Sequence, residues 1–269
     1  MGRLIPGLIM GAGCLGLLIW GASLVISLVI TVVAALALRE LFAILLPELK
    51  GVAFGITFLA TLLPCIGAFF GSLHALIGAF VMGLLCIVLI SFRWYTPFTA
   101  WFGQVYTYLG SSVFALTYIS LLLGHLILTA RLTDGSGWLI VLLALTAGSD
   151  TGAYYAGKNF GKSKLCPIIS PKKTVEGLLG GVITGSLAAA VAVIVLFDTR
   201  TALFFLPACI VLILIGVCGD LTESIIKRSF QIKDSGTILG GHGGILDRID
   251  SLLLSGPILY YLLQYGVIG

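Results

Sequence analysis

The sequence predicts an all-α polytopic membrane protein with about nine transmembrane helices, on three observations. Hydrophobic residues make up 59% of the 269 residues and charged residues only 10%, whereas a soluble domain is about 45–50% apolar and about 25% charged. The mean hydropathy is +1.17. Apolar runs of about 20 residues recur, which is the length needed to cross a hydrocarbon core of ~30 Å. These runs do not alternate with polar residues, so an outer-membrane barrel is excluded.

The nine expected spans follow one another along the whole chain. They lie at about residues 4–20, 22–46, 51–71, 73–92, 107–130, 137–157, 177–197, 202–219 and 249–266. Trp94 and Tyr95 close the fourth span, as aromatic residues do at a membrane interface. We expect a single integral membrane domain, residues 1–269. Within it, residues 1–130 form a scaffold, and residues 131–269 form the catalytic helices and cytoplasmic loops.

Two basic loops predict the orientation in the membrane. Residues 158–173 carry five lysines, and residues 227–248 carry two lysines and two arginines. Short basic loops lie in the cytoplasm. Two expected spans separate the loops, so both fall on the same side, as the rule requires. The predicted topology therefore has the amino terminus in the cytoplasm and the carboxyl terminus outside.

Residues 220–250 form the main polar stretch and hold nine of the 26 charged side chains. Asp220 ends the eighth span, Asp247 lies at the start of the ninth, and Asp150 lies near the end of the sixth. A carboxylate inside or near a membrane helix is costly and marks a functional site. Carboxylate oxygens are ligands that Mg²⁺ prefers. We expect the three carboxylates to converge on the cytoplasmic side, with Asp220 and Asp247 sharing a metal.

Cations and glycines accompany these carboxylates. A polar stripe runs from Asp220 to Lys227 at the three- and four-residue spacings of one helix face. The glycine-rich residues 240–244 would let backbone N–H groups approach a phosphate. Thr174 can cap the seventh span, whose amino end favours an anion. A metal surrounded by lysines and arginines is what phosphoryl or nucleotidyl transfer requires.

Simpler interpretations stay open for single residues. The lysines of residues 158–173 also fit a role in topology alone, and His242 also fits an ordinary loop residue. His74 and His125 are expected to be satisfied side chains inside the bundle. The six cysteines form no CxxC pair, so no disulfide framework or zinc site is predicted. The net charge of +4 is too small and too dispersed to indicate nucleic-acid binding.

The order of residues over 224–250 resembles the signature of the phosphatidate cytidylyltransferase (CDP-diacylglycerol synthase) family. The shared pattern is Ser224-x-Ile226-Lys227-Arg228-x4-Lys233-Asp234-x-Gly236-x2-Leu239-Gly240-x-His242-Gly243-Gly244-Ile245-x-Asp247-Arg248-Ile249-Asp250. A second block is similar to the same family: Ser149-Asp150-Thr151-Gly152-Ala153-Tyr154, Gly157-Lys158, Gly161-Lys162 and Ser170-Pro171-Lys172-Lys173-Thr174-x-Glu176-Gly177. Gly240 departs from the pattern, because many relatives have proline there.

The resemblance implies the reaction of CTP with phosphatidate to give CDP-diacylglycerol and pyrophosphate, in phospholipid biosynthesis at the cytoplasmic (inner) membrane. It implies dependence on Mg²⁺, with K⁺ as a second ion, and a homodimer. Residues 1–130 carry no motif of the family, and we expect them to serve as scaffold, in lipid contacts or in the dimer. The active site is then expected to face the cytoplasm.

Three sets of site residues follow from the matching positions. The catalytic residues are Asp220, Asp247, Lys227, Arg228, Lys233 and Arg248. The substrate-binding residues are Ser149, Lys158, Lys162, Ser170, Lys172, Lys173, Thr174, Glu176, Ser224, Asp234, His242, Gly243, Gly244 and Asp250. The metal ligands are Asp220 and Asp247, with Asp150 near them.

Two other functions stay open. A CTP-dependent lipid kinase acting on polyprenols or phytol would share the membrane fold and the need for Mg²⁺, but the extended pattern from His242 to Asp250 argues against it. A transporter would place its polar residues near the bilayer midplane, whereas most polar residues here fall at one face of the expected spans.

Overall fold

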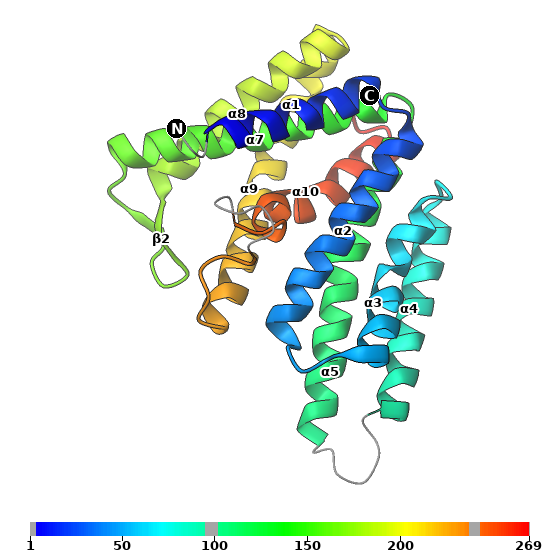
Figure 1. Cartoon of the computed structure of the whole chain (residues 1–269). Helices are drawn as coiled ribbons and strands as arrows, with labels where there is room; N and C mark the ends of the chain where they lie inside the picture. Colours follow the sequence, from blue (N-terminus) through cyan, green and yellow to red (C-terminus); the bar gives the residue numbers. More distant parts are fainter. Residues whose placement is uncertain (1–3, 95–101, 237–242, 269) are drawn as a thin grey trace. The chain divides into compact units, whose positions relative to one another are not determined.

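Helices and one small hairpin make up the regular structure of a computed structural model that describes residues 4–94, 102–236 and 243–268 (Figure 1). The chain divides into two compact units. The first combines Gly21–Thr133 with Asp234–Leu246, and the second combines Gly2–Trp20 with Asp134–Lys233 and Asp247–Gly269. Each unit is therefore discontinuous in sequence, and each is considered by itself.

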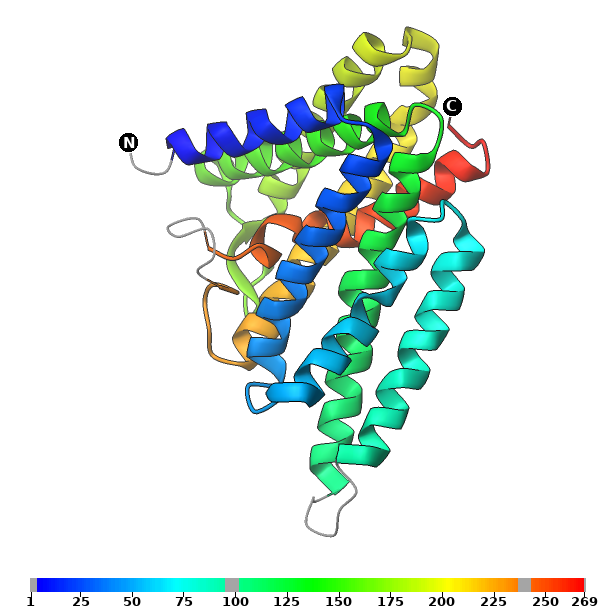
Figure 2. The same ribbon diagram turned by 45° about the vertical axis from the view of Figure 1, so that its right-hand side comes forward.

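The first unit is a helical bundle. It contains α2 (Ser23–Leu45), α3 (Gly51–Ala68), α4 (Leu73–Trp94), α5 (Phe102–Ala115), the π-helical turn η1 (Leu116–Leu121) and α6 (Leu122–Arg131). Helix α3 packs along α4, and α2 packs along α6 (Figure 2). Its core includes Ile87, Tyr108 and Leu116, all fully buried, and the Tyr108 hydroxyl lies 2.8 Å from Thr57 Oγ1. The segment Asp234–Leu246 joins this bundle from a distant part of the sequence.

The second unit carries most of the predicted site residues. It contains α1 (Leu4–Trp20), α7 (Gly135–Phe160), the strands β1 (Lys164–Cys166) and β2 (Ser170–Thr174), α8 (Val175–Leu196), α9 (Thr199–Ser229) and most of α10 (Leu246–Gln264). Helices α7 and α8 run side by side (Figures 1 and 2). Their backbones approach closely because small residues face each other: a Cβ on Gly152 would overlap Thr184. The Thr184 hydroxyl donates to the Gly148 carbonyl at 2.8 Å, a pattern typical of packed membrane helices.

All nine expected spans are helical in the described residues, which confirms the helical prediction. Within the part of the chain that the structure describes, seven helical segments are long and apolar enough to cross a membrane. They are Ser23–Leu45, Gly51–Ala68, Leu73–Arg93, Gly103–Arg131, Gly135–Phe160, Val175–Leu196 and Thr199–Ser229. The apolar part of α1, Gly11–Trp20, is shorter, and α10 is not among the seven. The chain therefore has the helices of a multi-pass membrane protein, while the exact number of spans and their orientation stay predictions.

Two elements differ from the expected boundaries in a way that shapes the site. Helix α9 continues to Ser229, ten residues beyond the expected end of the eighth span. At 1.5 Å per residue its 31 residues reach about 46 Å, more than a ~30 Å hydrocarbon core. The connection after α7, expected to be a loop, contains an antiparallel hairpin in which Lys164 pairs with Thr174 and Cys166 with Ser170. These strands are too short and too polar to show an alternating pattern.

Candidate functional site

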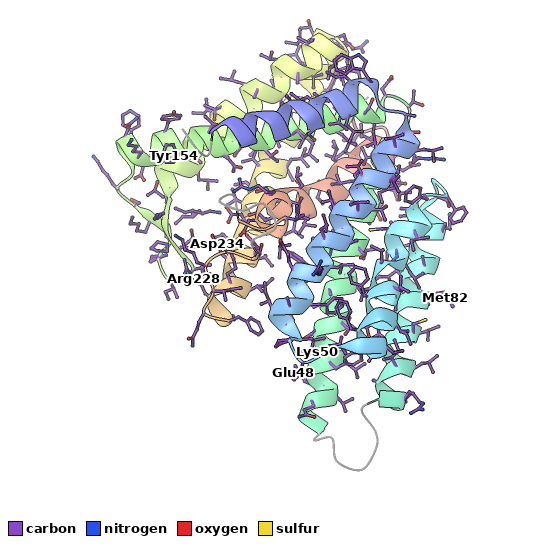
Figure 3. All side chains as sticks on the ribbon, viewed as in Figure 1. Glu48, Lys50, Met82, Tyr154, Arg228 and Asp234 are labelled. Atoms are coloured by element: carbon purple, nitrogen blue, oxygen red, sulfur yellow. The ribbon has the colours of Figure 1, made fainter. Side chains whose placement is uncertain are left out.

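A polar cavity of about 220 Å³ lies inside the second unit, between α7, the hairpin, α8, α9 and α10. Its polar lining comes from four segments that are far apart in sequence. The polar or charged lining residues are Ser149, Asp150, Tyr154, Lys172, Lys173, Thr174, Asp220 and Ser251. Tyr154 projects from α7, as Figure 3 shows. The cavity therefore joins the block around Asp150 with the block around Asp220, as the sequence predicts.

The hairpin positions the lysines of the cavity. Strand β2 leads directly into α8, and the Thr174 hydroxyl oxygen accepts a hydrogen bond from Gly177 N at 3.1 Å, so Thr174 caps α8 as expected. The Glu176 carboxylate accepts hydrogen bonds from Lys162 N at 3.0 Å and Ser163 N at 3.2 Å, which holds the start of the hairpin against α8. Lys173 then points into the cavity, where its Nζ lies 2.6 Å from Asp220 Oδ2.

Three carboxylates form a cluster beside this ion pair. Candidate ligand oxygens of Asp220, Glu223 and Asp250 all lie within 4.8 Å of one another. Asp220 and Glu223 share a face of α9 because they are three residues apart. Asp250 reaches them because α10 passes close to α9: a Cβ on Gly219 would overlap the Asp250 carbonyl oxygen. A small residue at that position therefore brings the third carboxylate into the cluster.

Lys227 connects the cluster to Asp247. Its Nζ donates to Glu223 Oε2 at 2.8 Å and to Asp247 Oδ1 at 2.6 Å. The lysine side chain is 16% exposed and the aspartate 12%. Lys227 thus ties α9 to α10. The expectation that Asp220 and Asp247 share a metal stays a prediction, and the arrangement favours Glu223 and Asp250 as the neighbours of Asp220.

The donor set of this cluster fits a hard divalent cation. Its oxygens come from carboxylates, which Mg²⁺ prefers. Glu223 is 1% exposed, and its Oε1 has no hydrogen-bond partner in the described structure. An unpartnered buried carboxylate oxygen is costly, and a cation would satisfy it. Two lysines, Lys173 and Lys227, form ion pairs with three carboxylates of this region, those of Asp220, Glu223 and Asp247.

A second cavity of about 440 Å³ lies between α1, α7 and α10, again within the second unit. It is amphipathic. Its lining includes apolar or small side chains, among them Cys14, Leu143 and Ala147, and it also includes Asp150, Asp247, Arg248 and Asp250. Asp150 and Ser251 line both cavities. A ligand with an acyl chain and a charged headgroup suits such a lining better than a wholly polar ligand does.

The other predicted site residues are distributed as follows. Lys158 and Lys162 are exposed and line neither of these two cavities, and Lys158 lies 5.9 Å from the centre of the Tyr154 ring. Arg228 and Lys233 are exposed at and beyond the end of α9. Ser170 begins β2, and the Ser224 hydroxyl lies 3.4 Å from Asp220 Oδ1. Asp234, Gly243 and Gly244 belong to the first unit, and His242 lies outside the described residues.

Sequence reasoning missed Glu223 and Ser251 as site residues. Glu223 stands three residues after Asp220, within the polar stripe from Asp220 to Lys227, and that spacing is the available signal. Ser251 carries no such signal, because a serine in an apolar helix is common. Its amide donates to the Asp250 carboxylate at 2.7 Å.

Comparison with known proteins adds to this geometry. Residues 1–266 match the model of the family described as the Cytidylyltransferase family. The chain is 43% identical over 141 residues to the Phosphatidate cytidylyltransferase of Bacillus subtilis (strain 168), and the aligned region covers 52% of each protein. It is 44% identical over 142 residues to the Phosphatidate cytidylyltransferase of Staphylococcus saprophyticus, covering 52% of this chain and 54% of that one. It is 42% identical over 157 residues to a protein of Escherichia coli (strain K12) named Uncharacterized protein YnbB, covering 57% and 51%. The matched region thus spans about half the length of these relatives.

Proposed function

Because the chain belongs to the cytidylyltransferase family, we propose that it is a phosphatidate cytidylyltransferase, which converts CTP and phosphatidate into CDP-diacylglycerol and pyrophosphate. The observation that carries the proposal is the pair of adjoining cavities. One is polar and holds Lys173 and Asp220, and the other is amphipathic and holds Arg248. A nucleotidyl transfer to a lipid requires one place for each of these two reactants.

The polar cavity is the proposed place of the CTP triphosphate. Lys172 and Lys173 line it from the hairpin, and ammonium groups at this position would neutralise phosphate oxygens. Lys158 and Lys162 flank the same hairpin and would add positive charge where the nucleotide enters. Bound triphosphate would compete with Asp220 for Lys173, because that lysine lies 2.6 Å from the carboxylate.

Asp220, Glu223 and Asp250 are the proposed ligands of Mg²⁺, since their oxygens already lie within 4.8 Å of one another. When bound, Mg²⁺ would supply neutralisation of charge on the triphosphate and on the leaving pyrophosphate. Asp150 faces both cavities and is the proposed contact of a second, monovalent cation, K⁺. Lys227 would hold Glu223 and Asp247 in place by its two hydrogen bonds.

The amphipathic cavity is the proposed place of phosphatidate. Its apolar part would take acyl-chain carbons along Leu143 and Ala147, and Arg248 would pair with the phosphate headgroup. Arginine binds phosphate through a planar fork of N–H donors. Asp150 and Ser251 line both cavities, so a lipid phosphate at this end would lie next to the nucleotide.

The proposed chemical step is a direct displacement at phosphorus. A phosphate oxygen of phosphatidate attacks the α-phosphorus of CTP and forms the new P–O bond. The bond from the α-phosphorus to the oxygen that bridges to the β-phosphate breaks, and pyrophosphate leaves with its electron pair. The attacking phosphate is already anionic, so no strong base is needed. The residues of the site act mainly by holding two negatively charged reactants together.

The cellular setting forms part of the same proposal. The basic loops 158–173 and 227–248 would face the cytoplasm, where CTP is available, in a multi-pass protein of the cytoplasmic membrane. A homodimer is also proposed, in keeping with the family resemblance, and residues 1–130 would serve as scaffold and contribute to its contacts.

The position of the radioactive label in CTP provides the test. The full chain in detergent micelles is given phosphatidate and CTP labelled either at the α- or at the γ-phosphate, with and without Mg²⁺. We expect label in the lipid only from α-labelled CTP and only with Mg²⁺, together with release of pyrophosphate. In a parallel reaction with a polyprenol in place of phosphatidate, transfer of the γ-label to the polyprenol would instead identify a CTP-dependent lipid kinase. Asp198→Asn, which alters a helix cap at the other end of α9, is a control that should leave turnover intact.

A further inference from the structure

A buried carboxylate in the first unit is not used by the proposed reaction. Glu40 lies on α2 and is 5% exposed. Its two oxygens accept hydrogen bonds from Ile245 N at 3.0 Å, Leu246 N at 3.0 Å and the Ser235 hydroxyl at 3.2 Å. All three donors belong to the segment Asp234–Leu246, which packs in the same unit. One side chain of α2 therefore holds both described ends of this segment.

Two glycines of the segment leave the space that this carboxylate occupies. A Cβ on Gly236 would overlap Glu40 Oε1, and a Cβ on Gly244 would overlap Glu40 Oε2 and the Ser235 hydroxyl. Any larger residue at either position would have to displace the carboxylate. Gly243 adds a backbone with φ of 81°, a conformation that favours glycine. The glycines of the segment thus allow the backbone to close around Glu40.

The contact falls at the amino end of α10. The first amides of a helix have no partner within the helix, and a negative side chain there is favoured by the helix dipole. Glu40 supplies an acceptor to Ile245 N and to Leu246 N, the first residue of α10. It therefore acts as a helix cap contributed by another helix, and the next residue in the chain is Asp247.

We propose that Glu40 is a positioning residue, which fixes the two ends of the segment 235–246 and the first peptide groups of α10. Through the chain it sets the backbone that carries Asp247 and Arg248. The expected effect of Glu40 on turnover rests on the proposed function. The contacts that hold residues 235 and 244–246 against Glu40, called the Glu40 clamp below, do not rest on it. Glu40 touches neither reactant in this proposal.

Glu40→Gln tests the clamp with little change in size. The amide has only one oxygen, so one donor of the set must face an NH₂ group instead of an acceptor. The matched control is Glu48→Gln, which neutralises an exposed carboxylate in the turn after α2 (Figure 3). We expect hydrogen exchange at the amides of residues 245 and 246 to rise by about 10- to 100-fold in Glu40→Gln, as local opening without global unfolding does. Exchange in α7 and α8 should stay at the wild-type rate.

Kinetics provide the second readout. In Glu40→Gln we expect kcat to fall by about 10- to 100-fold, the effect of a small misplacement, while KM for CTP changes less than threefold. Glu48→Gln should match the wild type in both. Unchanged exchange at residues 245 and 246, or exchange that rises equally in α7 and α8, would overturn the proposal. The proposal would also be overturned if the wild-type enzyme is active and Glu40→Gln has the same kcat as Glu48→Gln. If the wild-type chain fails to use CTP and phosphatidate, the proposed function fails, and the exchange measurement still decides whether Glu40 is a clamp.

Discussion

Lys227 on α9 donates a hydrogen bond to Asp247 on α10, with 2.6 Å between Nζ and Oδ1. The same ammonium group holds Glu223 at 2.8 Å. One cation thus joins the end of the longest helix to the start of α10, where the signature pattern places its last carboxylates. The sequence predicts that Asp220 and Asp247 share a metal, whereas in the structure Glu223 and Asp250 lie with Asp220, and Asp247 is joined to Glu223 through Lys227.

Loss of this lysine should destabilise the protein. Lys227→Met keeps much of the side-chain volume but leaves Glu223 and Asp247 without their shared cation. Removing one partner of a buried ion pair costs about 3–5 kcal/mol of folding free energy. Because Lys227 is partly exposed, we expect a loss near the lower end of that range. We expect a clear drop in the midpoint of thermal unfolding in detergent, with Lys164→Met as the control, because Lys164 is an exposed residue of strand β1. A midpoint equal to that of the control would show that the pair contributes little.

Metal affinity should distinguish Glu223 from Asp247. If Glu223 is a ligand, Glu223→Gln should raise the Mg²⁺ concentration required for half-maximal activity by about 10- to 100-fold, the range measured for weakened metal sites. Asp247→Asn should lower kcat with a smaller change in that concentration. Activity measured against Mg²⁺ concentration provides the comparison. If Asp247→Asn instead raises the required Mg²⁺ concentration more than Glu223→Gln does, Asp247 is a metal ligand and Glu223 is not.

Lys173 is expected to act on the nucleotide. Its Nζ lies 2.6 Å from Asp220 Oδ2 at the wall of the polar cavity. Lys173→Ala should reduce kcat/KM for CTP by about 10- to 100-fold, because a charge-assisted hydrogen bond contributes about 1.5–3 kcal/mol. Lys164→Ala on the neighbouring strand serves as control, since Lys164 lines neither cavity. Equal kcat/KM values for the two variants would exclude Lys173 from CTP binding.

Much of the site could be predicted because its residues carry local signals. Asp150, Lys173 and Asp220 stand out as charges in an apolar chain, and Thr174 stands at the start of a span with the side chain of a helix cap. The role of Glu40 could not be predicted, because its partner Ser235 is 195 positions away and no pattern in the sequence of α2 indicates that contact. The hairpin was also missed, since its pairing depends on contact with α8 and not on strand propensity.

The lipid site leads to the last prediction, which concerns Ala147 on α7. Ala147 lines the amphipathic cavity and is absent from the lining of the polar one. Ala147→Phe would fill space that the acyl chain is proposed to occupy, so KM for phosphatidate should rise about tenfold or more, in line with the ~0.8 kcal/mol lost for each CH₂ that is no longer buried. KM for CTP should stay within about threefold, because the nucleotide cavity is unchanged. The control is Val191→Phe, which adds an aromatic ring at an outward position of α8 that is 61% exposed. Steady-state kinetics with phosphatidate in mixed micelles measure both constants, and an equal rise in both for Ala147→Phe would place the lipid elsewhere.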